Sequence, residues 1–154
     1  MIGKKHLLGS NVIMQIGIVV SNIEKTAEDY AKFFGVKTPS INLTGPAEET
    51  HTEYKGEPTT ARAKLAFFRF KNITIELIQP DGAPSTWYEF LDIKGEGVHH
   101  IAFHVKESNA KIDGLVNQGM PLAQKGNFKG GRYAYIDSTG PLKVIIELLE
   151  RVLK

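Results

Sequence analysis

Four polar side chains occupy corresponding strand positions in the two halves of this sequence and could together bind a divalent metal ion. Gln15 begins the segment QIGIVV, and His100 begins HIAFHV, which overlays it directly. Glu76 in ITIEL and Glu147 in VIIEL correspond in the same way. A carboxylate in the middle of an apolar strand is costly to bury unless it is paired or bound to a cation. Two such carboxylates therefore predict a metal site.

The alternation of apolar residues places these four side chains on one face of a sheet. Side chains at every second position of a strand share a face. The apolar residues at alternate positions should pack under helices: Ile16, Ile18, Val20, Ile75, Leu77, Ile101, Phe103, Val105, Ile146 and Leu148. The four polar residues then share the opposite face. Gly17 and Ala102 on that face are small, and we expect them to leave room for a ligand.

The donor set favours a hard or borderline divalent ion. Two carboxylates, an imidazole and an amide oxygen would neutralise such an ion and leave about two of six coordination positions for water or substrate oxygens. The chain has no cysteine, so it has no thiolate site and no disulfide framework. The candidates are Zn, Ni, Co or Mn, together with Mg. For each residue alone, a solvated or structural role is the alternative.

The elements that must position these residues follow the order strand, helix, strand, strand, strand, twice. Periodicity predicts them at 12–20, 22–34, 41–43, 63–70 and 73–79, and again at 97–105, 108–119, 121–123, 133–136 and 142–149. Ser21 and Glu24 form the S-x-x-E pattern of a capping box, and Gly35 suits the left-handed end of a helix. An α+β fold is therefore expected.

Two further segments divide the chain. Residues 45–60 contain two prolines and several carboxylates, which predicts an exposed or mobile loop. Residues 81–96 predict a connector between modules at about 12–80 and 97–151. Neither module can bury its apolar sheet face alone. We therefore expect one domain over 12–154 after a flexible tail at 1–11.

Charge and hydropathy narrow the classes of partner. The net charge of +2 comes from 19 basic and 17 acidic residues that are scattered along 154 positions, which argues against a nucleic-acid partner. No segment has the roughly 18 apolar residues of a membrane span, and the start lacks the apolar stretch of a signal peptide. The sequence predicts a cytoplasmic protein without a membrane partner.

Over about 12–151 these residues resemble the vicinal oxygen chelate superfamily of glyoxalase-like metalloenzymes. The second half, with GEGVHHIAFHV and GGRYAYIDSTGPLKVIIELLE, is most similar to methylmalonyl-CoA epimerases. The resemblance implies two tandem βαβββ modules that form a curved mixed sheet cup with helices outside, and a homodimer. It also implies that Gln15, Glu76, His100 and Glu147 bind the metal and that Glu147 is an acid/base.

Two positions depart from the epimerase pattern. Gln15 stands where epimerases usually have His, and the set Gln, Glu, His, Glu resembles that of lactoylglutathione lyase, glyoxalase I. The second acid/base Glu of the epimerases maps near Thr60, where this chain has none. Glu53 and Glu57 are the nearest substitutes.

These observations predict a metal-dependent enzyme that abstracts a proton α to a carbonyl through an enolate or enediolate. The expected substrate is an acyl-CoA thioester or, as in glyoxalase I, a thiol hemithioacetal, and His104, Arg132 and Tyr135 are candidates to contact it. An extradiol dioxygenase is a rival, although non-haem iron usually needs two His and one carboxylate, which Gln15 argues against. A metal-free binding protein is the third hypothesis, with a pocket lined by Trp87, Tyr88, Phe128, Tyr133 and Tyr135.

Overall fold

Two equivalent groups of elements build the sheet, in the order that the sequence predicts. The computed structural model describes residues 6–152. The first group is β1 (Gln15–Val19), α1 (Ile23–Phe34), β2 (Asn42–Leu43), β5 (Ala63–Arg69) and β6 (Thr74–Pro80), and the second is β7 (Gly97–His104), α4 (Ser108–Asn117), β8 (Leu122–Phe128), β9 (Gly131–Ile136) and β10 (Ile145–Arg151). The other elements are α2 (Ala47–Thr50), β3 (Glu53–Tyr54), β4 (Glu57–Pro58), α3 (Thr86–Lys94) and α5 (Thr139–Leu142).

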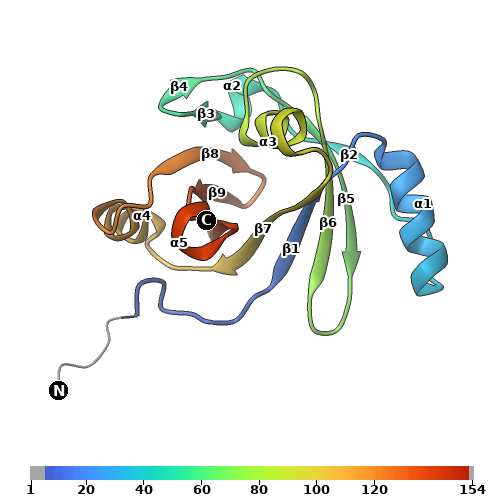
Figure 1. Cartoon of the computed structure of the whole chain (residues 1–154), viewed down its shortest axis with the longest axis horizontal. Helices are drawn as coiled ribbons and strands as arrows, with labels where there is room; N and C mark the ends of the chain where they lie inside the picture. Colours follow the sequence, from blue (N-terminus) through green and yellow to red (C-terminus); the bar gives the residue numbers. More distant parts are fainter. Residues whose placement is uncertain (1–5, 153–154) are drawn as a thin grey trace.

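The strands form one mixed sheet in the order β2-β5-β6-β1-β7-β10-β9-β8-β3-β4. In each half the first strand pairs in parallel with the last, β1 with β6 and β7 with β10. The two halves meet where β1 pairs antiparallel with β7. The sheet curves into a half-barrel, with α1 and α4 on its outside (Figure 1). This confirms the predicted α+β fold of two βαβββ modules.

The faces of the sheet follow the predicted alternation. Val20, Leu77 and partly buried Ile18 pack with Ile23, Ala27 and Ala31 of α1. Phe103, Ile146 and Leu148 pack with Ile112 and Leu115 of α4. The alternate residues of the same strands point into the cup, where Val19 joins a third cluster with Ile78, Trp87, Tyr135 and Ile145. The polar residues of interest therefore share the inner face.

Helix α1 begins with a different cap from the predicted one. Asn22 Oδ1 accepts the Lys25 backbone N–H at 3.1 Å, whereas the Ser21 hydroxyl donates to Glu96 Oε1 at 2.7 Å. Glu24 pairs with Lys64 instead of reaching back to the cap. The capping-box prediction was wrong because partners distant in sequence compete for these side chains: the acceptor Glu96 for Ser21 and the donor Lys64 for Glu24. Gly35 ends the helix at φ 67°, as predicted.

The segment 45–60, predicted as an exposed or mobile loop, instead contains a short helix and two short strands, and part of it is buried. We call residues 45–58 the strap. It leaves β2 at one edge of the sheet, forms α2, and adds β3 to β8 near the other edge. Thr50 and Thr52 are buried, and their hydroxyl oxygens lie 2.8 Å apart. The strap therefore spans the opening of the cup (Figure 1).

Two other segments contain helices that the hydrophobic periodicity did not predict. The connector at 81–96 includes α3, whose residue Trp87 packs on the inner face of the sheet. The strand expected from 142 begins only at Ile145, because α5 precedes it. Within the predicted tail, Leu8 packs against the α4 cluster, while residues 1–5 lie outside the described part, as do 153–154 of the predicted domain. Among residues 6–152 no helix is long and apolar enough to cross a membrane.

Gly17 lies against His100 at the junction of the two halves. A bulge lets Gly17 pair with His100 while Ile18 pairs with Val98. A Cβ atom at Gly17 would lie 2.0 Å from His100 Cε1. The prediction that Gly17 leaves room for a ligand was wrong, since the imidazole fills that space.

The substitution Gly17→Ala should lower the free energy of unfolding by about 1–3 kcal/mol, the usual cost of overpacking a core. In contrast, Gly114→Ala should raise it by about 0.5–1 kcal/mol, because a Cβ on this α4 residue meets no atom within 4 Å and alanine favours a helix. Urea unfolding of both variants measures the difference. Equal stabilities would contradict the proposed packing of His100.

Candidate metal centre

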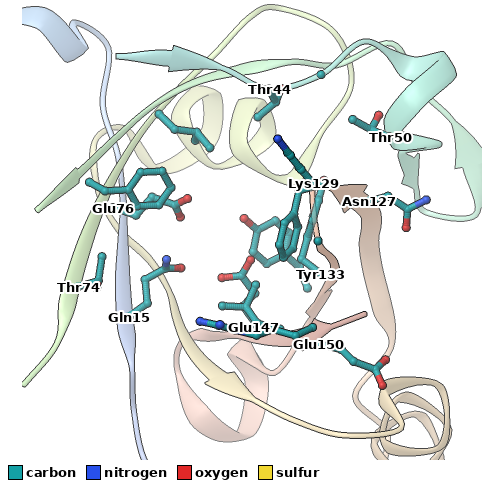
Figure 2. Close-up of a pocket in the computed structure, with 18 of the residues that line it drawn as sticks. Gln15, Thr44, Thr50, Thr74, Glu76, Asn127, Lys129, Tyr133, Glu147 and Glu150 are labelled. Atoms are coloured by element: carbon teal, nitrogen blue, oxygen red, sulfur yellow. The ribbon is translucent and has the colours of Figure 1, made fainter. Parts of the chain in front are cut away.

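The four predicted ligands come together on the floor of the cup. Gln15, Glu76, His100 and Glu147 come from the four central strands β1, β6, β7 and β10. Each is at most 7% exposed. Figure 2 shows the head groups of Gln15, Glu76 and Glu147 turned toward one another. Both halves of the chain therefore contribute two residues to one site.

Three oxygen atoms surround a single nitrogen of His100. Its Nε2 atom lies 2.8 Å from Glu147 Oε2, 3.1 Å from Gln15 Oε1 and 3.4 Å from Glu76 Oε1. One N–H group cannot satisfy three acceptors. Glu76 Oε1 and Glu147 Oε2 accordingly have no hydrogen-bond partner of good geometry, although both atoms are buried.

This arrangement fits a divalent cation. The ligand atoms of Glu76, His100 and Glu147 all lie within 4.8 Å of one another. Ligand atoms about 2.1 Å from a common ion lie roughly 3 Å apart in neighbouring coordination positions. Two unpartnered carboxylate oxygens would gain a counter-charge from such an ion. The donors contain no sulfur, which leaves the choice among Zn, Ni, Co and Mn open.

Burial and mutual charge shift the pKa values of these groups. Burial raises the pKa of Glu76, and His100 only partly offsets that effect. Burial would lower the pKa of His100, but Glu147 and Glu76 outweigh it and raise the pKa to about 9. Burial also raises the pKa of Tyr135, with a further contribution from the two carboxylates. The site therefore favours a positive charge between Glu76 and Glu147.

A cavity of about 1080 Å³ opens above the floor. Gln15, Glu76 and Glu147 line its base, and Trp87, Tyr133 and Tyr135 form an aromatic wall. Trp87 Nε1 donates to the Tyr135 hydroxyl at 3.0 Å, and Gln124 Nε2 donates to the Tyr133 hydroxyl at 2.9 Å. Three cationic residues also line the cavity: Arg69, Lys129 and Arg151.

The residues predicted to contact a substrate occupy different places. His104 and Tyr135 line the cavity. Arg132 is not among the lining residues, and its Nε atom donates to Glu150 Oε1 at 2.8 Å. Glu150 also accepts from Ser108, which together with Arg132 lowers its pKa to about 2. The structure therefore directs Arg132 to Glu150 and not to the cavity.

A further carboxylate reaches the cavity from the strap. Glu49 in α2 lines the cavity, whereas neither Glu53 nor Glu57 does. Glu53 lies 3.8 Å from Lys125 across the β3–β8 pair, and Glu57 is exposed on the edge strand β4. The sequence carried no signal for Glu49, since its position depends on how the strap crosses the cup.

His99 is a second residue whose place the sequence did not reveal. It is 1% exposed, and its Nδ1 atom lies 2.9 Å from His100 Nδ1. Strict alternation would put His99 on the outer face, but the bulge opposite Gly17 turns both rings inward. The adjacent histidines were the only available signal.

Residues 14–135 match the Glyoxalase/Bleomycin resistance protein/Dioxygenase superfamily, and the chain belongs to this family. The sequence resemblance to the vicinal oxygen chelate superfamily is thereby confirmed. The family includes enzymes and binding proteins, so membership alone defines no single reaction.

The chain is similar to proteins from several bacteria. It is 29% identical to the uncharacterised protein YqjC of Bacillus subtilis (strain 168), covering 91% of this chain and 92% of the relative. Methylmalonyl-CoA epimerase from Mycobacterium tuberculosis shares the fold with a TM-score of 0.65 and 21% identity, over 99% of this chain and 94% of that one. A variant of Streptomyces coelicolor methylmalonyl-CoA epimerase in complex with 2-nitronate-propionyl-CoA has a TM-score of 0.61 and 19% identity, over 92% and 97%.

In chelator-treated protein, the free energy of unfolding should fall as the pH rises from about 6.5 to about 9. The raised pKa of His100 stabilises the fold below the unfolded value near 6.5, and this contribution is lost as the pH passes the folded value. The full effect is at most about 3–4 kcal/mol for a change of this size. The raised pKa of Glu76 acts in the same direction.

Urea titrations at pH 6.5, 8 and 9 measure this effect. The variant His100→Gln should lose most of the alkaline decrease. With saturating Zn²⁺ the trend should reverse, because the ion replaces the Nε2 proton. A wild-type stability that stays constant over this range would contradict the ion-pair assignment.

Proposed function

We propose that this chain is a metal-dependent enzyme that removes the proton α to the thioester carbonyl of an acyl-CoA, as in methylmalonyl-CoA epimerases. The main support is the convergence of three side-chain oxygens on His100 Nε2 at the base of a large cavity. The fold shared with solved epimerases supports the same reaction class.

Gln15, Glu76, His100 and Glu147 would hold the divalent ion. When bound, such an ion supplies Lewis-acid stabilisation of negative charge on a carbonyl oxygen. The four residues come from hydrogen-bonded central strands, so backbone pairing fixes their relative positions.

Glu147 would take the α-proton, because its carboxylate both borders the cavity and lacks a hydrogen-bond partner for Oε2. Tyr135 would bind a substrate oxygen. Its hydroxyl oxygen accepts from Trp87 Nε1, which leaves its own O–H free to donate into the cavity. Both groups are buried, which would limit the access of water to the α-carbon.

Glu49 would act on the opposite face of the substrate. Epimerisation requires one group to remove the proton and another to return it from the other side. Glu49 lies on the strap and lines the cavity, whereas Glu147 lies on the sheet. These two carboxylates would therefore share the proton transfers, with Glu49 in the role first assigned to Glu53 or Glu57.

The cations that line the cavity would contact an anionic carrier. Arg69, Lys129 and Arg151 make no ion pair within 4 Å among the described residues. The phosphates of coenzyme A would neutralise them, and the volume of about 1080 Å³ accommodates a thioester end.

A homodimer and a cytoplasmic location remain predictions from the sequence.

A glyoxalase I-like isomerisation is the second candidate, since the ligand types Gln, Glu, His and Glu resemble those of lactoylglutathione lyase. That reaction also begins with removal of a proton next to a carbonyl. The two candidates differ in the thiol carrier, so a panel of acyl-CoA thioesters and thiol hemithioacetals distinguishes them.

The substitution Glu147→Gln should lower α-proton exchange in heavy water by about 10²–10⁴-fold. Both enantiomers of a 2-methyl acyl-CoA should be affected, because the variant loses a metal ligand as well as a base. Glu49→Gln should lower the interconversion of the two enantiomers by a similar factor. It should leave α-proton exchange of one enantiomer, since Glu147 can still remove that proton. NMR of the α-proton measures both quantities, and metal analysis of each variant accompanies them.

Glu53→Gln is the matched control, because this strap carboxylate does not line the cavity. It should keep exchange and interconversion within about twofold of wild type. Full activity of Glu147→Gln would refute the mechanism. Tight binding of the ligands without metal or turnover would favour a binding protein, and iron-dependent catechol cleavage would favour a dioxygenase.

Lys129→Gln should raise the KM for an acyl-CoA about threefold and leave kcat unchanged, since an exposed contact with a phosphate contributes less than about 1 kcal/mol. A truncated thioester without phosphates should show no such change. Initial rates at low and high salt measure this effect. An equal change for both substrates would contradict a carrier contact.

A further inference from the structure

His99 and His100 form a buried pair at the bulge of β7. The extra residue at the bulge places both rings on the inner face, where their centroids lie 5.0 and 5.1 Å from that of Tyr135. The His99 ring also lies edge-to-face with Phe90 at 5.4 Å. His99 and His100 are 1% and 0% exposed, so bulk water does not reach either ring.

The short contact between the two rings fixes where their protons lie. The Nδ1 atoms are 2.9 Å apart, so one of them donates a proton and the other accepts it. His100 Nε2 already faces the oxygens of Gln15, Glu76 and Glu147. If His100 is to offer a lone pair to an ion from Nε2, its proton must sit on Nδ1. His99 Nδ1 must then be the acceptor.

We infer that His99 is a positioning residue that accepts the Nδ1 proton of His100 and so keeps Nε2 of His100 directed at the metal ligands. This inference rests on the proposed metal site. Metal-binding histidines usually donate their second nitrogen to a carboxylate, a carbonyl or water. Here the acceptor is an uncharged ring, so His99 adds no further negative charge beside two buried carboxylates.

The surroundings of His99 support this assignment. With Nδ1 as acceptor, the ring carries its own proton on Nε2. The Thr86 carbonyl lies near this ring, but Nε2 forms no hydrogen bond of good geometry there. The imidazole is therefore held by its contact with His100 and by packing against Phe90 and Tyr135.

A pair of variants separates the acceptor from the packing. His99→Asn places Oδ1 where Nδ1 lies, so it keeps an acceptor for His100. His99→Phe keeps an aromatic ring against Phe90 and Tyr135 but has no acceptor. Urea unfolding of both variants identifies any loss of the fold.

The first readout is the tautomer of His100, observed by two-bond ¹H–¹⁵N correlation of the ring nitrogens. In chelator-treated wild type and His99→Asn at pH above 9, the proton should be on Nδ1, where the residue at position 99 accepts it. In chelator-treated His99→Phe at the same pH, the proton should shift toward Nε2, which faces the oxygens of Gln15, Glu76 and Glu147. An unchanged Nδ1 proton in folded His99→Phe would overturn the inference.

The second readout is the affinity for Zn²⁺, measured by competition with a chelator. His99→Phe should bind Zn²⁺ about 10–100-fold more weakly than wild type, and His99→Asn should recover most of this loss. Equal affinities for Zn²⁺ in folded wild type and folded His99→Phe would also overturn the inference that His99 positions His100. If wild type binds no divalent ion, the proposed function fails, while the tautomer of chelator-treated protein still tests the contact between the two rings.

Discussion

The antiparallel pairing of β1 with β7 is the constraint on which the site depends. It brings the two halves of the chain together, and it places the His100 ring directly over Gly17. Gln15 and Glu76 lie on one side of this junction, whereas His100 and Glu147 lie on the other. Neither half alone has a complete donor set. The burial that stabilises the paired modules and the assembly of the ligands are therefore the same event.

The buried polar residues on the floor of the cup lower the free energy of unfolding, and the rest of the inner face must offset this loss. Two carboxylates with buried, unpartnered oxygens oppose folding unless a positive charge lies between them. Protonated His100 provides that charge in one state, and a divalent ion would provide it in another. Around them, Val19, Ile78 and Ile145 form an apolar layer. This layer keeps the dielectric low, which strengthens either interaction.

The sequence predicted the sheet and its inner polar residues because both follow from local patterns. Alternation assigned Glu76 and Glu147 to one face, and the repeat matched Gln15 with His100. The errors arose where distant partners decide the local structure. Ser21 bonds to Glu96, 75 residues away, so its capping box does not form. The bulge that turns His99 inward depends on a register that no single strand specifies.

The strap shows why the position of Glu49 could not be predicted from the sequence. Strands β3 and β4 have two residues each, too few to show alternation, and β3 pairs with β8 far along the chain. That pairing spans only two positions, whereas the central strands pair over five or more. The strap therefore separates from the sheet at lower cost than the floor does. Glu49 therefore lies on an element with few backbone pairs, whereas the four ligands lie on the central strands, so a local separation of the strap would leave the metal site intact.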